Sequence, residues 1–451
     1  MVKIDYIILF ALTSYTLFIY LLLKGFLFSS LQRIFFFFGI WGTWFICGLG
    51  ASYEGVLFEY YLYYVIYLVC LGISFVGIVK FCIPMQFKIK NNAHHKIWNK
   101  VLEIKNIRNL TIFYFVCLFL PLVYPELRIG NIFNPPKPDI SFFTGLAENR
   151  DFFEKIVRYL QFLLFPFYLI FIYFLRKKII YLCFFVLFPL YIQLCESGYV
   201  GRGDFFVSFL IISIMIWFEY PKKRKKFLFV STITLPFLIY LFFALGHIRA
   251  GNEYIIEKSS FLDGIKEVLF VQTNFPYYSK YIIFSENRAS LDDYFVWLVT
   301  TPIPKVITGD IEGSRINYEI AYAIRGLKPG DLGFTVDLTG AVTESIFIYG
   351  NSFFWVHALF IGALFGFLCS IIESLPRAFV TVGIYFAVYW GYIFNRAGIA
   401  SAWPKLVNGF IPIYVLVFYF IFFTKYNTVR RKLDENTYVF SRENSASSSP
   451  D

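Results

Sequence analysis

The stretch CESGYVGRGDFF, residues 195–206, places an arginine and an aspartate among three glycines between two long apolar runs. The guanidinium of Arg202 offers a planar fork that matches two phosphate oxygens at once. Gly201 and Gly203 let backbone N–H groups approach an anion closely, and the start of a following helix favours negative charge. The stretch therefore predicts a phosphate-binding element.

Further arginines stand at the edges of apolar runs or in one long segment of the chain. They are Arg249, Arg315, Arg325 and Arg396. Together with Arg202 they would suit a diphosphate, provided that they meet in one pocket. Long basic side chains at helix ends also serve simply to reach a polar surface, and this is the competing interpretation for each of them.

One carboxylate, Glu344, lies in the otherwise apolar stretch GAVTESIFIYG, residues 340–350. An ionised side chain in apolar surroundings is costly, so its presence needs a reason. One such reason is acid–base chemistry, in which a carboxylate accepts the proton of an attacking hydroxyl group. We expect Glu344 to be this base, with Asp337 as the second candidate. We also expect the stretch to re-enter the membrane or to begin a span.

The composition indicates which elements carry these residues. The chain has 451 residues, of which 58% are hydrophobic, 22% aromatic and 16% charged. Its repeated apolar runs of about 17–22 residues have the length that crosses a bilayer. We predict an all-α polytopic membrane protein with about 11 transmembrane helices. The expected spans are residues 5–23, 34–50, 57–79, 109–124, 156–175, 179–195, 205–220, 227–247, 353–372, 378–394 and 406–424.

The net charge of +11 reflects basic residues that gather in short loops between the apolar runs. The loops are residues 24–33, 80–108, 176–178, 222–226 and 377, together with the tail 425–442. All of them fall on one side if the amino terminus is outside, and the positive-inside rule makes that side the cytoplasm. The charge pattern is thus a topology signal and indicates no nucleic-acid partner.

The spans divide the chain into four segments. They are the N-terminal transmembrane helices (1–247), a large outer loop (248–352), the C-terminal transmembrane helices (353–424) and a partly disordered cytoplasmic tail (425–451). The outer loop contains FLDGIKEVLFVQ and DDYFVWLVTTPIPK, whose apolar residues have helical spacing, so we expect amphipathic helices in it. A loop of this length is unusual and suggests work done on the outer face.

The sequence contains no motif for a metal or nucleotide cofactor. It lacks Walker A, G-x-S-x-G, H-E-x-x-H and Rossmann patterns. Its seven cysteines lie in or beside apolar runs, without a C-x-x-C pair, and we expect them to be small core residues. We therefore expect no metal and no cofactor.

Four stretches resemble the motifs of one protein family. SGYVGRGDFFVSFLI is similar to a glycine–arginine motif that opens a mid-chain helix, and DDYFVWLVTTPIPK to a segment with a proline- and basic-rich end. GFTVDLTGAVTESIFIYGNSFFW resembles a stretch with Thr335, Glu344 and Gly350 before a late span, and NRAGIAS supplies Arg396. The family is that of the oligosaccharide repeat-unit polymerases, which act on bacterial O-antigen and enterobacterial common antigen.

The resemblance implies a GT-C-like glycosyltransferase of the bacterial inner membrane. Its reaction would be a block transfer on the outer face, which moves a glycan from undecaprenyl diphosphate onto a new lipid-linked repeat unit. The implied product is O-antigen for lipopolysaccharide, or a capsule-type polysaccharide. The implied partners are undecaprenyl-diphosphate-linked oligosaccharides, membrane lipids and a chain-length regulator protein.

Other functions remain open at this point. An O-antigen ligase would carry a histidine in the large outer loop, and residues 248–352 contain none. Another lipid-phosphate sugar transferase would carry an acidic pair early in the chain. A transporter or flippase of lipid-linked glycans would show internal repeats and charges near the membrane midplane. The charges without a topological explanation lie instead on the predicted outer side, which favours the polymerase.

Overall fold

The structure is a computed structural model that describes part of the chain. The described residues are 6–27, 29–43, 58–91, 103–124, 128–134, 136, 152–197, 202–234, 290–301, 303, 316–327, 331, 340–395, 398–400, 402–404, 406–407, 411 and 414–415. Every regular element within these ranges is a helix, which confirms the all-α class for this part of the protein. The boundaries of the four predicted segments stay predictions.

The helices follow the apolar runs of the sequence. The principal ones are α1 (Tyr6–Lys24), α2 (Ser30–Thr43), α4 (Phe58–Asn91), α6 (Ile104–Val123), α7 (Phe152–Leu175), α8 (Ile179–Ser197), α9 (Arg202–Glu219), α13 (Leu291–Thr300), α15 (Ile316–Arg325), α16 (Ala341–Ser374) and α17 (Val380–Tyr389). Shorter helical turns are η2 (Arg128–Ile132), η4 (Pro221–Lys223), η5 (Arg377–Phe379) and the π-helical η6 (Trp390–Phe394).

Five helices in the described part are long and apolar enough to cross a membrane. They are Leu62–Cys82 within α4, Ile104–Val123, Ile156–Leu175, Ile179–Glu196 and Ala341–Ser374. A sixth candidate is the bent pair Asp204–Glu219 and Pro221–Thr234, whose two parts meet at 108°. The bend at Tyr220 directly precedes the predicted basic loop 222–226, whose residues are helical in the structure. The multi-pass character is therefore supported, while the higher number of spans predicted from the sequence stays a prediction.

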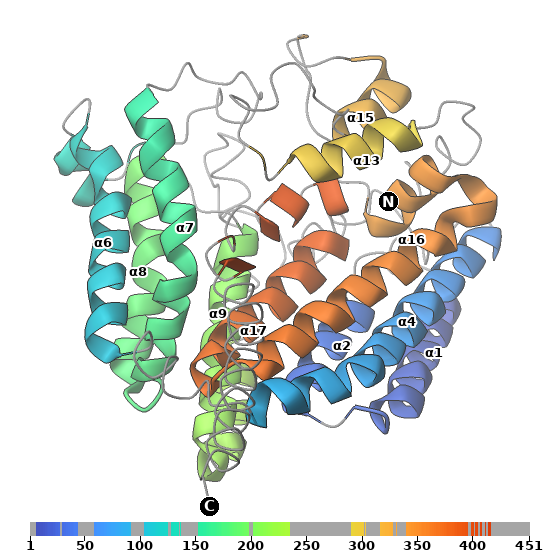
Figure 1. Ribbon diagram of the computed structural model, residues 1–451, viewed down its shortest axis with the longest axis horizontal. Helices are drawn as coiled ribbons and strands as arrows, with labels where there is room; N and C mark the ends of the chain where they lie inside the picture. Colours follow the sequence, from blue (N-terminus) through green and yellow to red (C-terminus); the bar gives the residue numbers. More distant parts are fainter. Residues whose placement is uncertain are drawn as a thin grey trace, which may run out of the picture.

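The helices form two groups, and α9 and α17 lie between them (Figure 1). Helices α6, α7 and α8 stand together on one side, and α1, α2, α4 and α16 on the other. Helix α17 lies between the groups and contacts α2, α7, α9 and α16, and nearly all of its residues are buried. The second group is closely packed because small residues face neighbouring backbones: a Cβ on Gly366 would lie 2.8 Å from the Phe75 carbonyl oxygen.

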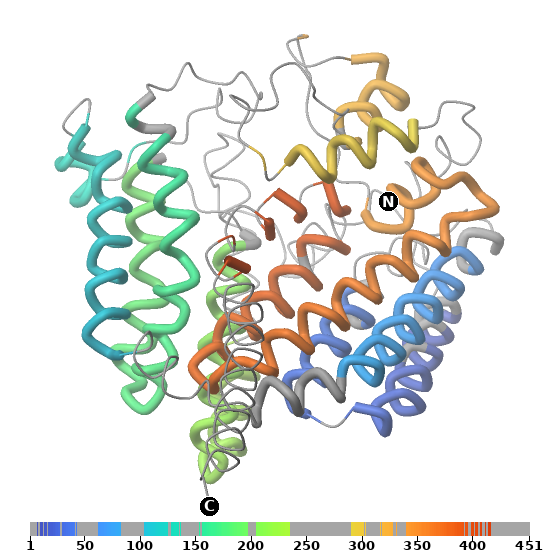
Figure 2. Tube along the Cα trace, in the orientation of Figure 1, coloured from blue at the N-terminus to red at the C-terminus, as the bar shows by residue number. Residues whose placement is uncertain are grey.

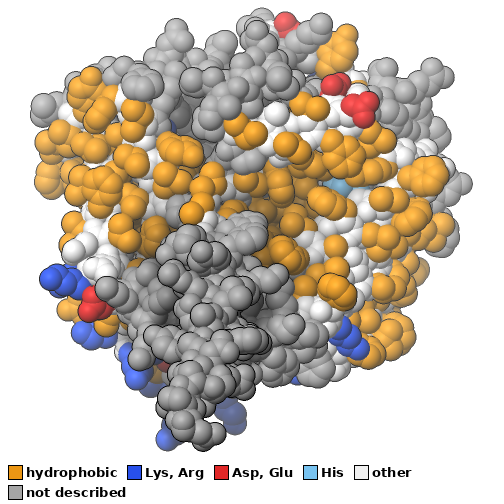
Figure 3. Space-filling model, viewed as in Figure 1, with side chains coloured by type: hydrophobic (Ala, Val, Ile, Leu, Met, Phe, Trp, Pro, Cys, Tyr) orange, Lys and Arg blue, Asp and Glu red, His pale blue; other side chains and the backbone are white. Residues whose placement is uncertain are grey.

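Basic side chains gather at one end of the bundle, visible along the lower edge of Figure 3. We call this the basic end, defined by Lys24, Arg33, Lys80, Arg176 and Arg377. Side-chain contacts at this end join segments that are distant in the sequence. Lys80 lies 4.0 Å from the ring centre of Phe26, and Arg176 Nε lies 2.9 Å from Glu219 Oε1. Helices α13 and α15 and the first part of α16 lie at the opposite end (Figure 1).

Candidate functional site

Helix α16 is broken close to its start, and the break shapes the candidate site. Gly350 has φ 74° and ψ 174°, which separates residues 341–349 from the long second part, 351–374. Figure 2 shows the first part running across the end of the molecule before the chain turns into the second. Residues 341–348 are all buried. A buried first part followed by a glycine break agrees with the expectation that this stretch re-enters or begins a span.

Glu344 lies in the first turn of α16, and its side chain is only 1% exposed. The backbone N–H groups of Ile399 and Ala400 donate hydrogen bonds to its carboxylate. A helical turn begins at Ile399, and the first N–H groups of a helix have no partner within the helix itself. Glu344 therefore caps a helical turn that comes much later in the chain.

Gly398 precedes this helical turn and faces the same carboxylate. Its φ is +75°, in the left-handed region that side-chain-bearing residues rarely adopt. A Cβ at this position would overlap Oε2 of Glu344. Glycine is thus required here for two reasons, namely the backbone conformation and the room that the carboxylate occupies.

His357, in the second part of α16, connects the site to α13. Its side chain is fully buried, and its Nε2 forms a hydrogen bond of 3.3 Å with the hydroxyl group of Tyr294. The rings of Tyr349 and Phe394 lie 5.7 and 6.3 Å from the imidazole. Burial raises the pKa of Tyr294, and the nearby charge of Glu344 raises it further, so the phenol stays neutral.

A second contact holds α13 one helical turn further along. The indole Nε1 of Trp403 donates a hydrogen bond of 2.9 Å to the carbonyl oxygen of Leu298. Helix α13, the start of α16 and the segment with residues 398–400 and 402–403 therefore meet in one place. We call this place the α13 junction, defined by Tyr294, Leu298, Glu344, His357 and residues 398–400 and 402–403.

The α13 junction also contains buried polar atoms that nothing satisfies. Among the described residues, Glu344 Oε1, Thr343 Oγ1 and His357 Nδ1 are buried and have no hydrogen-bond partner. Such atoms are uncommon in folded proteins, because each one costs the desolvation of a polar group. Where they occur together, they point to a functional site or to bound water.

The predicted diphosphate residues are only partly described. Helix α9 begins at Arg202, three residues before the predicted span 205–220, and includes Gly203, so the glycine–arginine motif forms the first turn of the helix. Asp204, in the same first turn, lies close enough to Tyr389 of α17 to interact with it electrostatically. Arg325 is the last residue of α15 and is exposed. No ion pair joins Arg325 to Glu344 in the part of the chain that the structure describes.

Several predicted site residues lie outside the described residues. They are Gly201, Arg249, Arg315, Asp337 and Arg396. Convergence of the arginines in one pocket therefore stays a prediction, and so does the role of Glu344 as a base.

The residues around Glu344 were not predicted from the sequence. No role was predicted for Tyr294 in DDYFVWLVTTPIPK or for Gly398 in NRAGIAS, and Trp403 lies outside the motifs. The contacts join residues far apart in the sequence: 63 positions separate Tyr294 from His357, and 105 separate Leu298 from Trp403. One local signal was available, since Gly398, two residues after Arg396 in NRAGIAS, lies between two apolar runs, where glycine indicates a break in the helical backbone.

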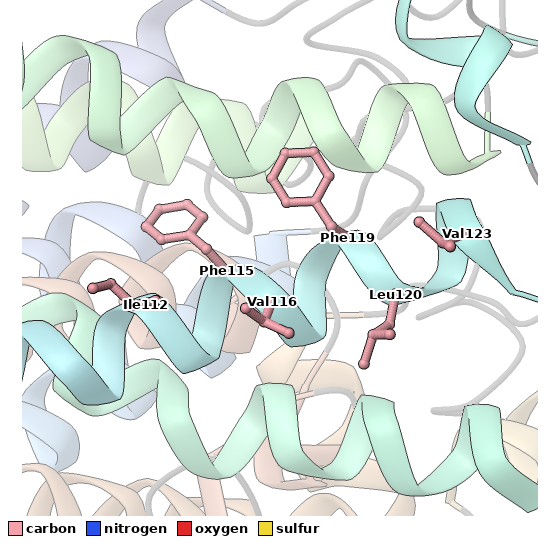
Figure 4. Close-up of a pocket in the computed structure, with 6 residues that line it drawn as sticks. All are labelled: Ile112, Phe115, Val116, Phe119, Leu120 and Val123. Atoms are coloured by element: carbon pink, nitrogen blue, oxygen red, sulfur yellow. The ribbon is translucent and has the colours of Figure 1, made fainter.

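One pocket of about 380 Å³ lies on α6 (Figure 4), and α6 stands on the other side of the molecule from α13 (Figure 1). It is lined by Ile112, Phe115, Val116, Phe119, Leu120 and Val123. An apolar hollow on an exposed face of a candidate membrane span suits hydrocarbon and offers no group for chemistry. The candidate site is therefore the α13 junction and not this pocket.

Fold and site together define a class: an all-helical protein, in its described part, with five or six candidate membrane spans and a buried polar junction at the end of the bundle opposite its basic residues. Comparison with models of protein families, with curated proteins and with solved structures finds no match to this chain.

Proposed function

We propose that this protein is a glycosyltransferase that polymerises lipid-linked oligosaccharide repeat units. It would act on undecaprenyl-diphosphate-linked glycans at the outer face of a bacterial inner membrane, as part of O-antigen or capsule-type polysaccharide synthesis. The basic end would face the cytoplasm, in accordance with the positive-inside rule. The α13 junction would then face outward, and the fold would be GT-C-like with the full number of predicted spans.

The observation that carries the proposal is the position of Glu344. This buried carboxylate lies at the end of the bundle opposite the basic residues, beneath a helix from the long segment 248–352. Buried ionisable groups in membrane proteins usually belong to functional sites. A site at this end is where a reaction on the outer face would need its polar groups.

The chemistry needs no nucleotide, since the lipid diphosphate is itself a leaving group. The anomeric C–O bond to the diphosphate breaks, and its electron pair remains on the diphosphate oxygen. The acceptor hydroxyl forms the new C–O bond and passes its proton to a carboxylate. We assign the stabilisation of the diphosphate to Arg202, Arg249, Arg315, Arg325 and Arg396, with Gly201 and Gly203 offering backbone N–H groups. Asp337 and Glu344 are the two carboxylates considered for the proton.

The proposal includes partners that follow from the reaction. The substrates have long apolar tails, so they enter from the lipid phase and reach the site along the exposed apolar faces of the bundle. A separate chain-length regulator would act on the same growing glycan.

Deletion of the gene, followed by gel analysis of the surface glycan, tests the proposal. A polymerase mutant retains glycan of one repeat unit and loses the ladder of longer chains. Complete loss of attached glycan would instead identify a ligase. Accumulation of lipid-linked units on the cytoplasmic face would identify a flippase, and either of these results would overturn the proposal.

A further inference from the structure

The geometry of Glu344 differs from that of an accessible base. A general base must approach the hydroxyl that it deprotonates to within about 3 Å. The Glu344 carboxylate is 1% exposed, receives two backbone hydrogen bonds, and has Gly398 packed against Oε2. The lone pairs of Oε2 are therefore directed at the protein backbone and not at a substrate.

The partner of Glu344 is the start of a helical turn. The N–H groups of Ile399 and Ala400 point out of this turn, where the helix end carries a partial positive charge. A carboxylate at such an end satisfies the N–H groups and offsets the partial charge. Since the side chain comes from α16, the contact fixes the turn to α16.

The residue before this segment is fixed as well. Asn395 is fully buried, and its Nδ2 donates a hydrogen bond of 3.3 Å to the carbonyl oxygen of Gly39 in α2. The chain is therefore held to α2 at Asn395 and to α16 at Ile399 and Ala400. In the sequence, Arg396 stands between these two attachments.

We infer that Glu344 is a positioning residue, which caps the turn at Ile399 and thereby holds the segment after Arg396 against α16. This inference deepens the proposed function and rests on it for its catalytic meaning. Within the proposed reaction, the proton of the acceptor hydroxyl goes to Asp337, and Glu344 acts only through the turn that it caps.

Hydrogen exchange of the purified protein tests the cap independently of any activity. In Glu344→Ala, the amide exchange of peptides covering residues 395–404 rises by about tenfold or more, because two N–H groups lose their acceptor. Glu344→Gln keeps a carbonyl oxygen that accepts an N–H, so its exchange stays within about threefold of wild type. The matched control is Glu373→Ala, which removes a carboxylate from the other end of the same helix and leaves these peptides unchanged.

The exchange result shows whether Glu344 caps the turn at Ile399, even if the proposed function is wrong. Unchanged exchange of residues 395–404 in Glu344→Ala would overturn the inference. If Glu344→Ala does not fold, Gly398→Ala replaces it, because its Cβ displaces the carboxylate. Faster exchange in that variant supports the cap, and wild-type exchange contradicts it.

Activity then separates the positioning role from the role of a base. An amide cannot accept the proton of the acceptor hydroxyl, whereas it can still accept an N–H. We expect Glu344→Gln to retain at least about a tenth of the polymerisation rate, since removing a base typically costs a hundredfold or more. The pH–rate profile of Glu344→Gln keeps its acidic limb, which belongs to another carboxylate. A loss of a hundredfold with unaltered exchange would make Glu344 the base and end this inference.

A wild-type protein without polymerase activity gives a third and separate result. It would remove the proposed function, while the exchange measurements would still decide whether Glu344 caps the turn.

Discussion

The two carboxylates of α16 lie near its opposite ends and are held in different ways. Glu344, near the start, is buried and receives hydrogen bonds from the backbone of Ile399 and Ala400. Glu373, near the end, is partly exposed and receives hydrogen bonds from the side chains of Ser29 and Gln32, the latter at 2.6 Å.

The partners of Glu373 are themselves parts of a local motif. Ser29 precedes α2, and its Oγ accepts a hydrogen bond of 3.0 Å from the backbone N–H of Gln32. The side chain of Gln32 reaches back to the N–H of Ser29 at 3.4 Å, which completes a capping box. Glu373 adds to a helix start that already has its own cap.

The partners of Glu373 and of Glu344 differ in how well they can adapt to a substitution. Side chains at the basic end can rotate or exchange a lost partner for water, because the site is partly exposed. Backbone N–H groups at the α13 junction cannot move without moving the chain, and burial separates them from bulk solvent. We therefore expect substitutions to have larger effects at the α13 junction than at the basic end.

The largest effect is expected for arginine replacements that keep the charge. Arg202→Lys should lower polymerisation by about a hundredfold or more, because a lysine cannot make the bidentate contact that stabilises the leaving diphosphate. The measurement is the ladder of surface glycan at matched protein level. Arg176→Lys is the control at the basic end, where Arg176 pairs with Glu219, and it should leave the ladder intact. A full ladder in Arg202→Lys would exclude this role for Arg202.

The next largest effect is expected for Gly398→Ala, which lowers the stability of the fold. The new Cβ would overlap Glu344 Oε2, and the left-handed backbone at φ +75° would be strained. We expect a loss of about 2–4 kcal/mol in the free energy of unfolding. The measurement is the thermal unfolding midpoint in detergent. Gly77→Ala is the matched control, since no atom lies within 4 Å of its added Cβ, and it should not destabilise the protein.

Tyr294→Phe removes one hydrogen bond from the α13 junction and nothing else. The hydroxyl pairs with His357 at 3.3 Å, and its loss leaves a second ring nitrogen of this buried histidine unsatisfied. We expect a destabilisation of about 1 kcal/mol. Tyr159→Phe, on the exposed face of α7, is the control. Equal unfolding midpoints for both variants would mean that this hydrogen bond contributes no net stability.

Sequence patterns predicted the helices better than the contacts between them. Apolar runs located the candidate spans, and the glycine–arginine motif located the start of α9, because both signals lie within a few neighbouring residues. The S-x-x-Q pattern at Ser29 is also local and could have been read as a helix start.

The α13 junction could not be predicted in the same way. Its contacts join Glu344 to Gly398 and Tyr294 to His357, and no local pattern encodes which distant backbone a carboxylate will cap. The sequence indicated that Glu344 needs a partner, since burial of an unpaired charge is costly. It suggested the attacking hydroxyl group of a substrate as the partner, whereas the structure has backbone N–H groups.

The smallest effect is expected for Glu373→Gln, and it is the sharpest test of the comparison. The amide oxygen still accepts a hydrogen bond from Gln32 or Ser29, and the partly exposed site lets water replace the other. We expect a change below about 1 kcal/mol in the free energy of unfolding. Glu344→Gln, measured alongside, should cost more, because its NH2 group takes the buried place of Oε1, which has no hydrogen-bond partner. If the two substitutions lower the free energy of unfolding equally, the start and the end of α16 tolerate the loss of a carboxylate equally well. Burial and backbone donors would then not account for a difference between them.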